Sequence, residues 1–319
     1  MNIERQLLDI CKINVPCYWL DSFEGNNIYI FREDLIPYSF GGNKVIIGIK
    51  YFEDMKKKDC DCMVAYGRPQ SNLCRVLSSI CKKSNIPYHI LAPVHEDDKE
   101  SLNSKIAEMM NAQIHMCERQ SISDEIRETI NKLRLQGLKP YYIYGNEFGV
   151  GNEDVPVSAY VERYINMIHA NVVQYSINDI VLPLGTGMTM AGIARGADYC
   201  RDVIDIIGIS VARKVETAYE YYTKYFNSYH GENSGNDDVK RIILDDYILD
   251  GYGTFNNDEE GTIYEAFYKY GIPLDPTYVG KAYWGMRRWI RSEGISGKNI
   301  LFIHTGGVPI WFDYILERK

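Results

Sequence analysis

The stretch Ser39-Phe40-Gly41-Gly42-Asn43-Lys44 is the most informative part of this chain. Its lysine follows the β-like run Asn27-Ile28-Tyr29-Ile30-Phe31 and precedes the apolar run Val45-Ile46-Ile47-Gly48-Ile49. The two glycines let the backbone approach another group closely. A lysine half-buried among apolar neighbours has a lowered pKa and can act as a Schiff-base nucleophile. Lysines are also common in solvated surface turns, so this stretch alone leaves both readings open.

Length and composition describe an ordinary globular protein with more than one domain. The chain has 319 residues, beyond the size at which a single core keeps growing. It is 45% hydrophobic and 24% charged, with a net charge of −8. An acidic balance argues against nucleic acid as a partner, because phosphate-backbone binding needs clustered Lys and Arg. A local pocket for one phosphate is still compatible with this charge.

Cysteine usage and hydropathy predict a cytoplasmic protein without a metal site. The eight cysteines form no CxxC pair and no His/Cys cluster with zinc spacing, so they are expected to be reduced thiols. The N-terminus lacks a basic region followed by an apolar core, and no apolar run reaches membrane-spanning length. We therefore expect no signal peptide and no membrane partner.

Strand-like and helix-like segments alternate along most of the chain. Expected strands are 62–66, 88–92, 113–116, 141–144, 179–184, 203–210 and 299–304, and expected helices are 71–83, 101–110, 123–136, 157–170, 189–201 and 216–225. This rhythm predicts an α/β fold of two domains, each a mostly parallel sheet with helices on both faces. The smaller domain is expected at 48–155, and the larger one at 1–47 plus 156–319.

The loop Gly185-Thr186-Gly187-Met188-Thr189 is the second feature that carries chemistry. It follows a buried-type strand and opens a helix, so several backbone N–H groups and a helix N-terminus point at one spot. That geometry binds a phosphate dianion. The glycine spacing is not that of a Rossmann fingerprint, and no Gly-Lys-Ser/Thr ends the loop as in a P-loop. The alternative is a tight strand-to-helix turn without a ligand.

Two further polar turns follow predicted parallel strands. Gln70-Ser71-Asn72 follows the first strand of the smaller domain, and His304-Thr305-Gly306-Gly307 follows the last strand of the chain. Ligands of parallel sheets bind at the carboxyl ends of the strands, where both turns are expected. Two alternatives stay open: Ser71 can be only a helix N-cap, and Thr305 only a turn hydroxyl bonded to its own backbone.

Taken together and in this order, these features resemble the tryptophan-synthase-β-like (fold type II) pyridoxal-phosphate enzymes. Within them, the chain is most similar to the D-cysteine desulfhydrase and 1-aminocyclopropane-1-carboxylate (ACC) deaminase group. The matching motifs are Phe31-Arg32-Glu33-Asp34-Leu35, Gly41-Gly42-Asn43-Lys44, Gln70-Ser71-Asn72, Gly251-Tyr252-Gly253, Asp275-Pro276-Thr277-Tyr278-Val279-Gly280-Lys281-Ala282 and His304-Thr305-Gly306-Gly307. They span residues 31–307, nearly the whole chain.

The resemblance implies a set of cofactor-binding residues for pyridoxal 5′-phosphate. Lys44 resembles the lysine that carries the cofactor and also moves the substrate's Cα proton. Asn72 resembles the residue that hydrogen-bonds the cofactor's 3′-oxygen, and Thr305 the hydroxyl beside its pyridine nitrogen. The residues that resemble the phosphate cradle are Gly185, Thr186, Gly187, Met188 and Thr189.

The resemblance also implies catalytic residues besides Lys44. Ser71 resembles a group near the substrate carboxylate or the leaving group, and Tyr252 and Tyr278 match the two active-site tyrosines of the group. A tyrosine hydroxyl near the β-carbon can donate a proton to a leaving group. Because the chain holds 26 tyrosines, core packing is the alternative for each of the two.

The implied activity is that of a pyridoxal-phosphate-dependent lyase or deaminase acting on a small amino acid. The expected reaction is an α,β-elimination that gives a 2-oxo acid and ammonia. Three other reactions on the same cofactor stay open: β-replacement, racemisation and ACC deamination. A non-catalytic amino-acid-binding protein on this fold is a further alternative. The resemblance also implies a homodimer.

Several positions depart from the family pattern and bear on the substrate. The altered residues are Arg68, Leu73, Met188, Met190 and Val279. Val279 stands where ACC deaminases carry glutamate and desulfhydrases threonine, which makes ring opening the weaker alternative. Thr305 stands where ACC deaminases tend to have leucine, so this contact looks desulfhydrase-like. Arg68 could bind a second anion on the substrate or be a surface arginine. These changes predict a diverged member whose substrate is not necessarily D-cysteine.

Overall fold

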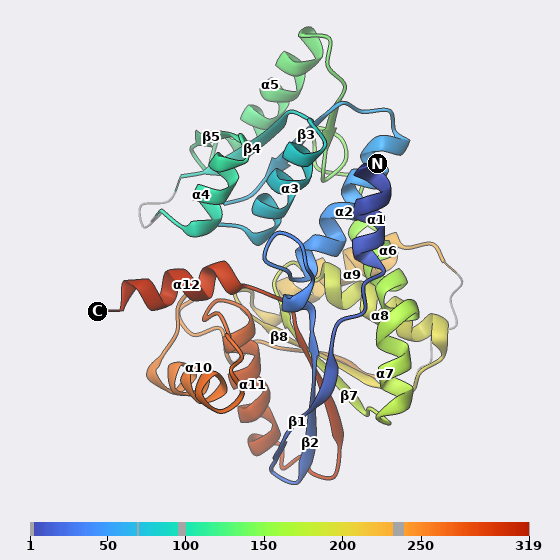
Figure 1. Ribbon diagram of the computed structural model, residues 1–319, viewed down its shortest axis with the longest axis vertical. Coiled ribbons are helices and arrows are strands. Elements are labelled where there is room, and N and C mark those ends of the chain that lie inside the picture. The colour runs from blue at the N-terminus through green and yellow to red at the C-terminus, as the bar shows by residue number, and fades with distance from the viewer. Residues whose placement is uncertain (1–2, 69, 95–99, 232–238, 319) are drawn as a thin grey trace. The chain divides into compact units, whose positions relative to one another are not determined.

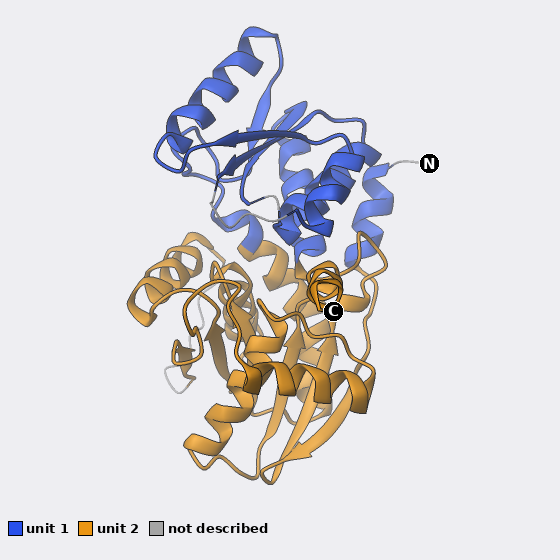
Figure 2. Cartoon of the chain, turned by 90° about the vertical axis from the view of Figure 1, so that its left-hand side faces the viewer, with its two compact units in different colours: residues 1–11, 44–156 blue, residues 12–43, 157–319 orange. Residues whose placement is uncertain are grey.

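The chain divides into two compact units, which a computed structural model describes over residues 3–68, 70–94, 100–231 and 239–318. Unit 1 is Met1–Cys11 with Lys44–Pro156, and unit 2 is Lys12–Asn43 with Val157–Lys319 (Figure 2). Residues 1–11 and 44–47 therefore lie in the smaller unit, whereas the sequence places them in the larger one. The reason is helix α2 (Asn43–Lys57), which is unbroken and packs Gly48 against Val76, so it carries its first residues into unit 1.

Unit 1 is built on a four-stranded sheet in which all strands are parallel. The strand order is β5 (Gln113–Cys117), β4 (Tyr88–Pro93), β3 (Cys62–Tyr66) and β6 (Pro140–Tyr142). Its helices are α1 (Ile3–Cys11), α2, α3 (Asn72–Lys83), α4 (Leu102–Met109) and α5 (Ile122–Leu135) (Figure 1). Helix α5 buries Ile126, Ile130 and Leu133, whose spacing puts them on one helix face. The β-α order predicted for this unit is confirmed.

Unit 2 is built on a six-stranded sheet that is parallel except at one edge. The strand order is β1 (Cys17–Phe23), β2 (Asn26–Arg32), β10 (Asn299–His304), β7 (Asp179–Leu184), β8 (Asp205–Ser210) and β9 (Arg241–Leu244). Only β1 pairs antiparallel, with β2. The predicted mostly parallel architecture is thus confirmed. Strand β10 lies between β2 and β7, and all three strands are parallel. The turns that follow them therefore meet at the carboxyl end of the sheet.

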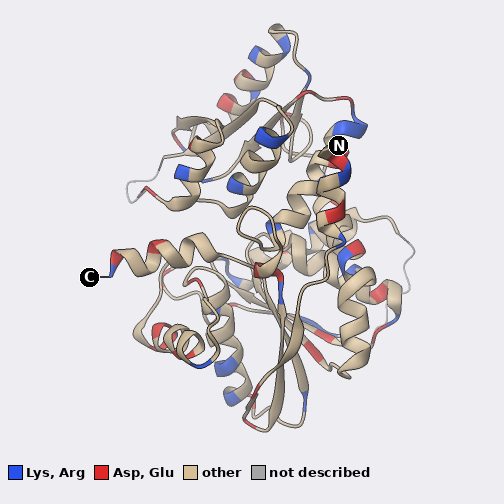
Figure 3. Cartoon of the chain, viewed as in Figure 1, with Lys and Arg blue, Asp and Glu red and all other residues tan. Residues whose placement is uncertain are grey.

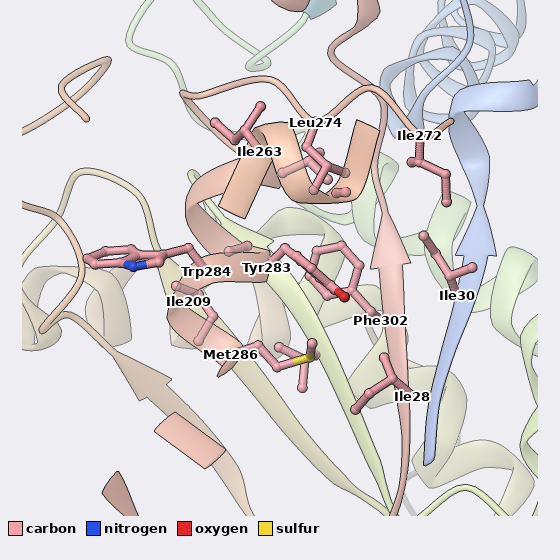
Figure 4. Close-up of a cluster of buried hydrophobic side chains, with 14 of the residues drawn as sticks. Ile28, Ile30, Ile209, Ile263, Ile272, Leu274, Tyr283, Trp284, Met286 and Phe302 are labelled. Atoms are coloured by element: carbon pink, nitrogen blue, oxygen red, sulfur yellow. The ribbon is translucent and has the colours of Figure 1, made fainter. Parts of the chain in front are cut away.

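The helices of unit 2 enclose a core rich in aromatic and β-branched side chains (Figures 1 and 4). They are α6 (Asp154–Arg163, shared at its start with unit 1), the π-helical turn η2 (Tyr164–Ile168), α7 (His169–Gln174), α8 (Met188–Cys200), α9 (Val215–Ser228), α10 (Asn257–Tyr270), α11 (Val279–Ser292) and α12 (Val308–Glu317). In Figure 4 Tyr283 of α11 packs edge-on against Phe302 of β10, with ring centroids 5.2 Å apart. This contact fixes α11 on the sheet.

The sequence and the structure differ at several elements. The helix predicted at 157–170 is three consecutive pieces, because η2 inserts a wider turn between α6 and α7. Elements that the sequence does not predict are α1, β1, α2, β9, α10, α11 and α12. Acidic and basic residues are interspersed over both units (Figure 3). Within the described ranges, no helix has the length and apolar character needed to cross a bilayer.

Candidate active site

The loop between β7 and α8 has the geometry of an anion cradle. Gly187 takes the left-handed conformation (φ +85°) at the N-cap of α8. The first backbone bond of the helix runs from the Ala191 N–H to the Gly187 carbonyl, 2.9 Å. The N–H groups of Met188, Thr189 and the next residue therefore have no acceptor inside the helix. A Cβ at Gly187 would lie 3.1 Å from the Tyr222 backbone, so the turn is closely packed from behind.

Asn43 joins this loop to the turn after β10. Its side-chain amide donates to the Thr189 hydroxyl (2.9 Å), and its backbone N–H donates to the Thr305 carbonyl (2.9 Å). All three residues belong to unit 2. Lys44 follows Asn43 directly as the second residue of α2, with a half-buried side chain. The surface-turn reading of this lysine does not hold, because Lys44 lies inside a helix and not in a turn.

The glycines before Lys44 pack backbone against backbone. Gly42 has φ +96°, and a Cβ there would lie 2.7 Å from the Thr305 carbonyl oxygen. Gly306 has φ +108°, and a Cβ there would lie 2.6 Å from the Gly42 Cα. Only glycine fits both a left-handed backbone and contacts of this kind. The contact of Gly42 with Thr305 and Gly306 therefore holds the segment leading to Lys44 at the carboxyl end of the unit 2 sheet.

Gly42→Ala is expected to destabilise the protein by about 2 kcal/mol or more, because it adds left-handed strain and a clash with a backbone carbonyl. Chemical denaturation measures the change. Gly261→Ala is the matched control, since Gly261 lies in α10 with no atom near its added Cβ. That control is expected to be neutral or stabilising by up to about 1 kcal/mol. Equal stability of Gly42→Ala and the wild type would contradict the close packing.

The residues of the Arg32-Glu33-Asp34 motif hold the segment that leads to Lys44. Glu33 is buried and forms an ion pair with Arg163 (3.1 Å) and a hydrogen bond with the Tyr160 hydroxyl. Asp34 pairs with Arg32 at 2.6 Å. The Glu33 carbonyl accepts the Gly42 N–H at 2.8 Å. These buried pairs explain the motif as a support for the loop before Lys44.

His304 fixes the turn that carries Thr305. Its Nε2 lies 2.9 Å from the Pro273 carbonyl, and its Nδ1 accepts the Gly306 N–H at 3.3 Å. Burial lowers the pKa of His304, against the opposing effect of Asp34, so the ring is neutral with its proton on Nε2. Thr305 is a buried residue, and its backbone carbonyl accepts the Asn43 N–H at 2.9 Å.

Tyr252 and Tyr278 lie side by side in unit 2. Their hydroxyls are 2.6 Å apart, and their rings meet edge to face with centroids 5.7 Å apart. A Cβ at Gly185 would lie 3.7 Å from the Tyr278 ring, so the pair adjoins the phosphate-type loop. Burial raises the pKa of Tyr278 well above its ordinary value, with the Tyr252 hydroxyl adding to the shift. The Tyr278 hydroxyl is thus protonated at neutral pH.

Asp275 sets the position of Tyr278. Its carboxylate accepts the backbone N–H groups of Thr277 (3.0 Å), Tyr278 (2.8 Å) and Val279 (3.2 Å) at the start of α11. Burial raises the pKa of Asp275 to about 7, although these three N–H groups oppose the shift. The sequence motif contained Asp275 but gave no reason for it. The structure supplies one, since the carboxylate caps the helix that begins beside Tyr278.

In unit 1, Ser71 and Asn72 begin helix α3. The Ser71 hydroxyl accepts the N–H groups of Leu73 (3.2 Å) and Cys74 (3.5 Å), so Ser71 is the N-cap of α3. The Asn72 side-chain oxygen accepts from the amide of Asn103 at 3.0 Å. Asn103 is completely buried and also donates to the Gln70 carbonyl, 2.8 Å. Sequence reasoning missed Asn103, which lies 31 residues from its partner in a helix without a family motif.

Three of the residues that depart from the family pattern lie in hydrophobic cores. Val279 is completely buried in the unit 2 core, and Leu73 is buried in α3. The Met190 sulfur would lie 2.8 Å from a Cβ at Gly208, so the missing side chain on β8 makes room for it. These changes therefore bear first on packing. Arg68 is half-buried in the turn before α3.

A His/Cys/Asp group lies elsewhere in unit 2, which the sequence does not predict. The ligand-type atoms of His169, Cys200 and Asp202 are within 4.8 Å of one another. One Asp202 oxygen accepts from both His169 (2.8 Å) and the Tyr164 hydroxyl (2.7 Å). The π-helical turn η2 brings these i, i+5 side chains to one carboxylate. These hydrogen bonds hold His169 and Tyr164 on the Asp202 carboxylate.

The protein family described as "Pyridoxal-phosphate dependent enzyme" matches residues 11–306 of this chain. The chain belongs to this family. The family is also the one that the sequence motifs resemble, and it makes pyridoxal phosphate the cofactor of this enzyme. A D-cysteine desulfhydrase of Salmonella typhi is 28% identical over 309 residues, which cover 92% of this chain and 91% of that protein.

Two solved structures share the fold of this family member. A structure of an ACC deaminase homologue has a TM-score of 0.82 and 24% identity, and covers 99% of both chains. A hydrogen sulfide-producing enzyme from Fusobacterium nucleatum has a TM-score of 0.66 and 18% identity, over 94% of this chain and 95% of that one. At these identities the likeness concerns the fold. It confirms the tryptophan-synthase-β-like α/β fold predicted from the sequence.

Proposed function

We propose that this pyridoxal-phosphate enzyme is a lyase that eliminates a β-substituent from a small amino acid and releases a 2-oxo acid and ammonia. The observation that carries the proposal is the hydrogen-bonded pair Tyr252 and Tyr278 beside the loop after β7. A protonated phenol close to the proposed cofactor-binding loop can donate a proton to a departing β-substituent. The name of the Salmonella relative, D-cysteine desulfhydrase, supports the same reaction.

The donor groups fit the chemistry of the cofactor. The unsatisfied N–H groups at the start of α8 suit the phosphate, with Gly185, Thr186, Gly187, Met188 and Thr189 as the proposed cradle. The hydroxyl of Thr305 suits the pyridine nitrogen, because a hydroxyl can donate or accept a hydrogen bond. In unit 1 the side chain of Asn72, held by Asn103, suits the 3′-oxygen, and the amine of Lys44 suits the covalent attachment. When bound, the cofactor supplies the electron sink.

Each protein group then has one task in the proposed reaction. The Lys44 amine takes the proton from the substrate's Cα. The Ser71 hydroxyl accepts two helix N–H groups and keeps its own proton, so it can still donate to the substrate carboxylate. Tyr278, in hydrogen-bond contact with Tyr252, gives its proton to the leaving group. Thr305 offers a neutral partner to the ring nitrogen and does not enforce its protonation, which favours prompt elimination over a long-lived carbanion.

The other reactions are weaker candidates. The glutamate that ACC deaminases carry is replaced by Val279, whose side chain is buried in the core, so ring opening lacks this acid–base group. β-Replacement and racemisation use the same lysine and cradle, and product analysis separates them from elimination. The non-catalytic alternative is not supported, because the chain belongs to a family of enzymes.

We further propose that the enzyme works in the cytoplasm as a homodimer on a small amino-acid substrate, without nucleic-acid or membrane partners. The reduced state of all eight cysteines is consistent with the cytoplasm. Light scattering coupled to size exclusion tests the dimer. The expected mass is twice the 36.8 kDa of one chain, and a single-chain mass at micromolar concentration would contradict it.

The deciding experiment gives the purified, cofactor-loaded enzyme a panel of D- and L-amino acids with and without a β-leaving group. Equimolar 2-oxo acid and ammonia are expected from the β-substituted members, with sulfide from cysteine. Unsubstituted alanine is the matched control and should give neither product. Release of 2-oxobutyrate from ACC without any β-elimination would overturn the proposal in favour of ring opening.

A further inference from the structure

The segment that carries Tyr252 is tied at both ends to one buried lysine. Lys281 lies in the first turn of α11 and is completely buried. Its Nζ donates to the carbonyl of Ile248 (3.3 Å) and to that of Thr254 (2.6 Å). These carbonyls stand on either side of Gly251-Tyr252-Gly253. The Lys281 side chain therefore fixes the distance between the two ends of this loop.

Hydrogen bonds within the loop also define its path, among them one from the Thr254 hydroxyl to the Gly251 carbonyl at 2.7 Å. Its backbone bonds are local, from the Gly251 N–H to the Ile248 carbonyl (3.0 Å) and from the Thr254 N–H to the Gly251 carbonyl (3.3 Å). Leu249, Gly251 and Gly253 all have positive φ, which is typical of an irregular turn. The side chain of Tyr252 is 40% exposed, so burial does not hold it in place. The backbone that Lys281 ties down therefore contributes to the position of the Tyr252 hydroxyl.

A buried carboxyl group of α10 interacts electrostatically with Lys281. Glu259 is completely buried in the first turn of that helix, and its carboxylate oxygens make no hydrogen bond within the part of the chain that is described. Burial raises the pKa of Glu259, and the facing Lys281 opposes the shift. Burial likewise lowers the pKa of Lys281, and Glu259 opposes it. Burying ionisable groups costs free energy. The two loop carbonyls that Lys281 holds give its burial a structural reason.

The two tyrosines thereby share one rigid support. Tyr278 stands at the N-terminus of α11, where the Asp275 carboxylate receives its N–H, and Lys281 follows one turn later on the same helix. Tyr278 is attached to α11 directly, and Tyr252 is attached to it through Lys281. The hydrogen bond between their hydroxyls (2.6 Å) therefore joins two side chains that are both attached to the start of α11.

We propose that Lys281 is a positioning residue, which holds the Tyr252 loop so that the Tyr252 hydroxyl stays in hydrogen-bond contact with that of Tyr278. The inference rests on the proposed function only in that the tyrosine pair serves the reaction. The positioning itself is a property of unit 2 and has a readout that needs no turnover.

Lys281→Met tests the proposal, with Lys298→Met as the matched control. Lys298 forms an ion pair with the buried carboxylate of Asp179 in unit 2, at 2.8 Å, and makes no hydrogen bond with residues 248–254. In Lys281→Met, amide hydrogen exchange over residues 248–254 of the cofactor-loaded enzyme is expected to accelerate by about tenfold or more. Lys298→Met should leave exchange in this segment unchanged. The absorbance of the bound cofactor should be that of the wild type in both variants.

Turnover provides the second readout. Lys281→Met is expected to lower kcat about as much as Tyr252→Phe does, with KM changed by less than about threefold, and the double variant should lose little more than either single one. Unchanged exchange in the 248–254 segment would overturn the proposal, and so would multiplying losses in the double variant. Accelerated exchange in a protein whose wild type is inactive on every amino acid would sink the proposed function and leave the positioning role intact.

Lys281→Gln covers the case in which Lys281→Met does not fold. It keeps an N–H donor on a shorter side chain, so it is expected to hold one of the two carbonyls. Exchange over 248–254 should then fall between that of the wild type and that of an unrestrained loop, and kcat should fall by a smaller factor than in Tyr252→Phe. Exchange equal to the wild type in Lys281→Gln would count against the proposal.

Discussion

Lys44→Ala is expected to lower turnover by at least about a thousandfold, because one amine is assigned both the covalent attachment of the cofactor and the transfer of the Cα proton. Steady-state formation of 2-oxo acid measures the loss. Borohydride reduction followed by peptide mass spectrometry gives an independent readout, since it should place a reduced cofactor label on Lys44 in the wild type. The variant should carry no such label.

The control for this loss is Lys50→Ala. Lys50 lies on the same helix, is half-buried and forms an ion pair with Glu53 at 3.2 Å. Removing it deletes a helix lysine of similar exposure without touching the segment that follows the glycine pair. Its turnover should stay within about twofold of the wild type. Turnover of Lys44→Ala within tenfold of the wild type would contradict the role of Lys44.

The strand-end turns could be predicted from the sequence because their signals are local. The strands 62–66, 179–184 and 299–304 are short apolar runs that end at polar or glycine residues, and the structure has them at the same bounds. A parallel sheet brings the residues after such runs to one edge. The turns after β7 and β10 thus meet in unit 2, and Asn43 bonds to both of them.

Elements with weak local patterns could not be predicted. Strand β1 is an edge strand with mostly exposed or half-exposed residues and an irregular register between Trp19 and Asp21, so it lacks a clean alternation. Strand β9 has only four residues. For such segments burial in the tertiary structure decides the element.

The roles of the residues that support the site could not be predicted, for a different reason. Asn103, Lys281 and Glu259 act through contacts with residues that lie far away in the chain, or through charges on a neighbouring helix. The donor in two of these contacts is a side chain and the acceptor a backbone carbonyl, so the partner's residue type carries no signal. Sequence patterns therefore identify the groups that do the chemistry more readily than the groups that hold them in place.

Tyr252 and Tyr278 differ in how firmly they are held, and this difference indicates different roles. Tyr278 is held by the helix start and lies against Gly185, whereas Tyr252 is 40% exposed on a loop. Burial raises the pKa of Tyr278 well above its ordinary value, so its proton is present across the neutral and mildly alkaline range. These features make Tyr278 the better candidate for the proton donor, with Tyr252 as its hydrogen-bond partner.

Tyr278→Phe is accordingly expected to lower kcat by about 100- to 10,000-fold, the range for loss of a general acid, with a smaller effect on KM. The matched control is Tyr283→Phe, which removes a hydroxyl from the same helix at a ring packed against Phe302. That control should keep its kcat within about threefold. For substrates whose leaving group needs no proton, Tyr278→Phe should lower kcat least, because the step that the variant loses is proton donation. An equal loss for every leaving group would show that the hydroxyl acts on binding geometry and not as an acid.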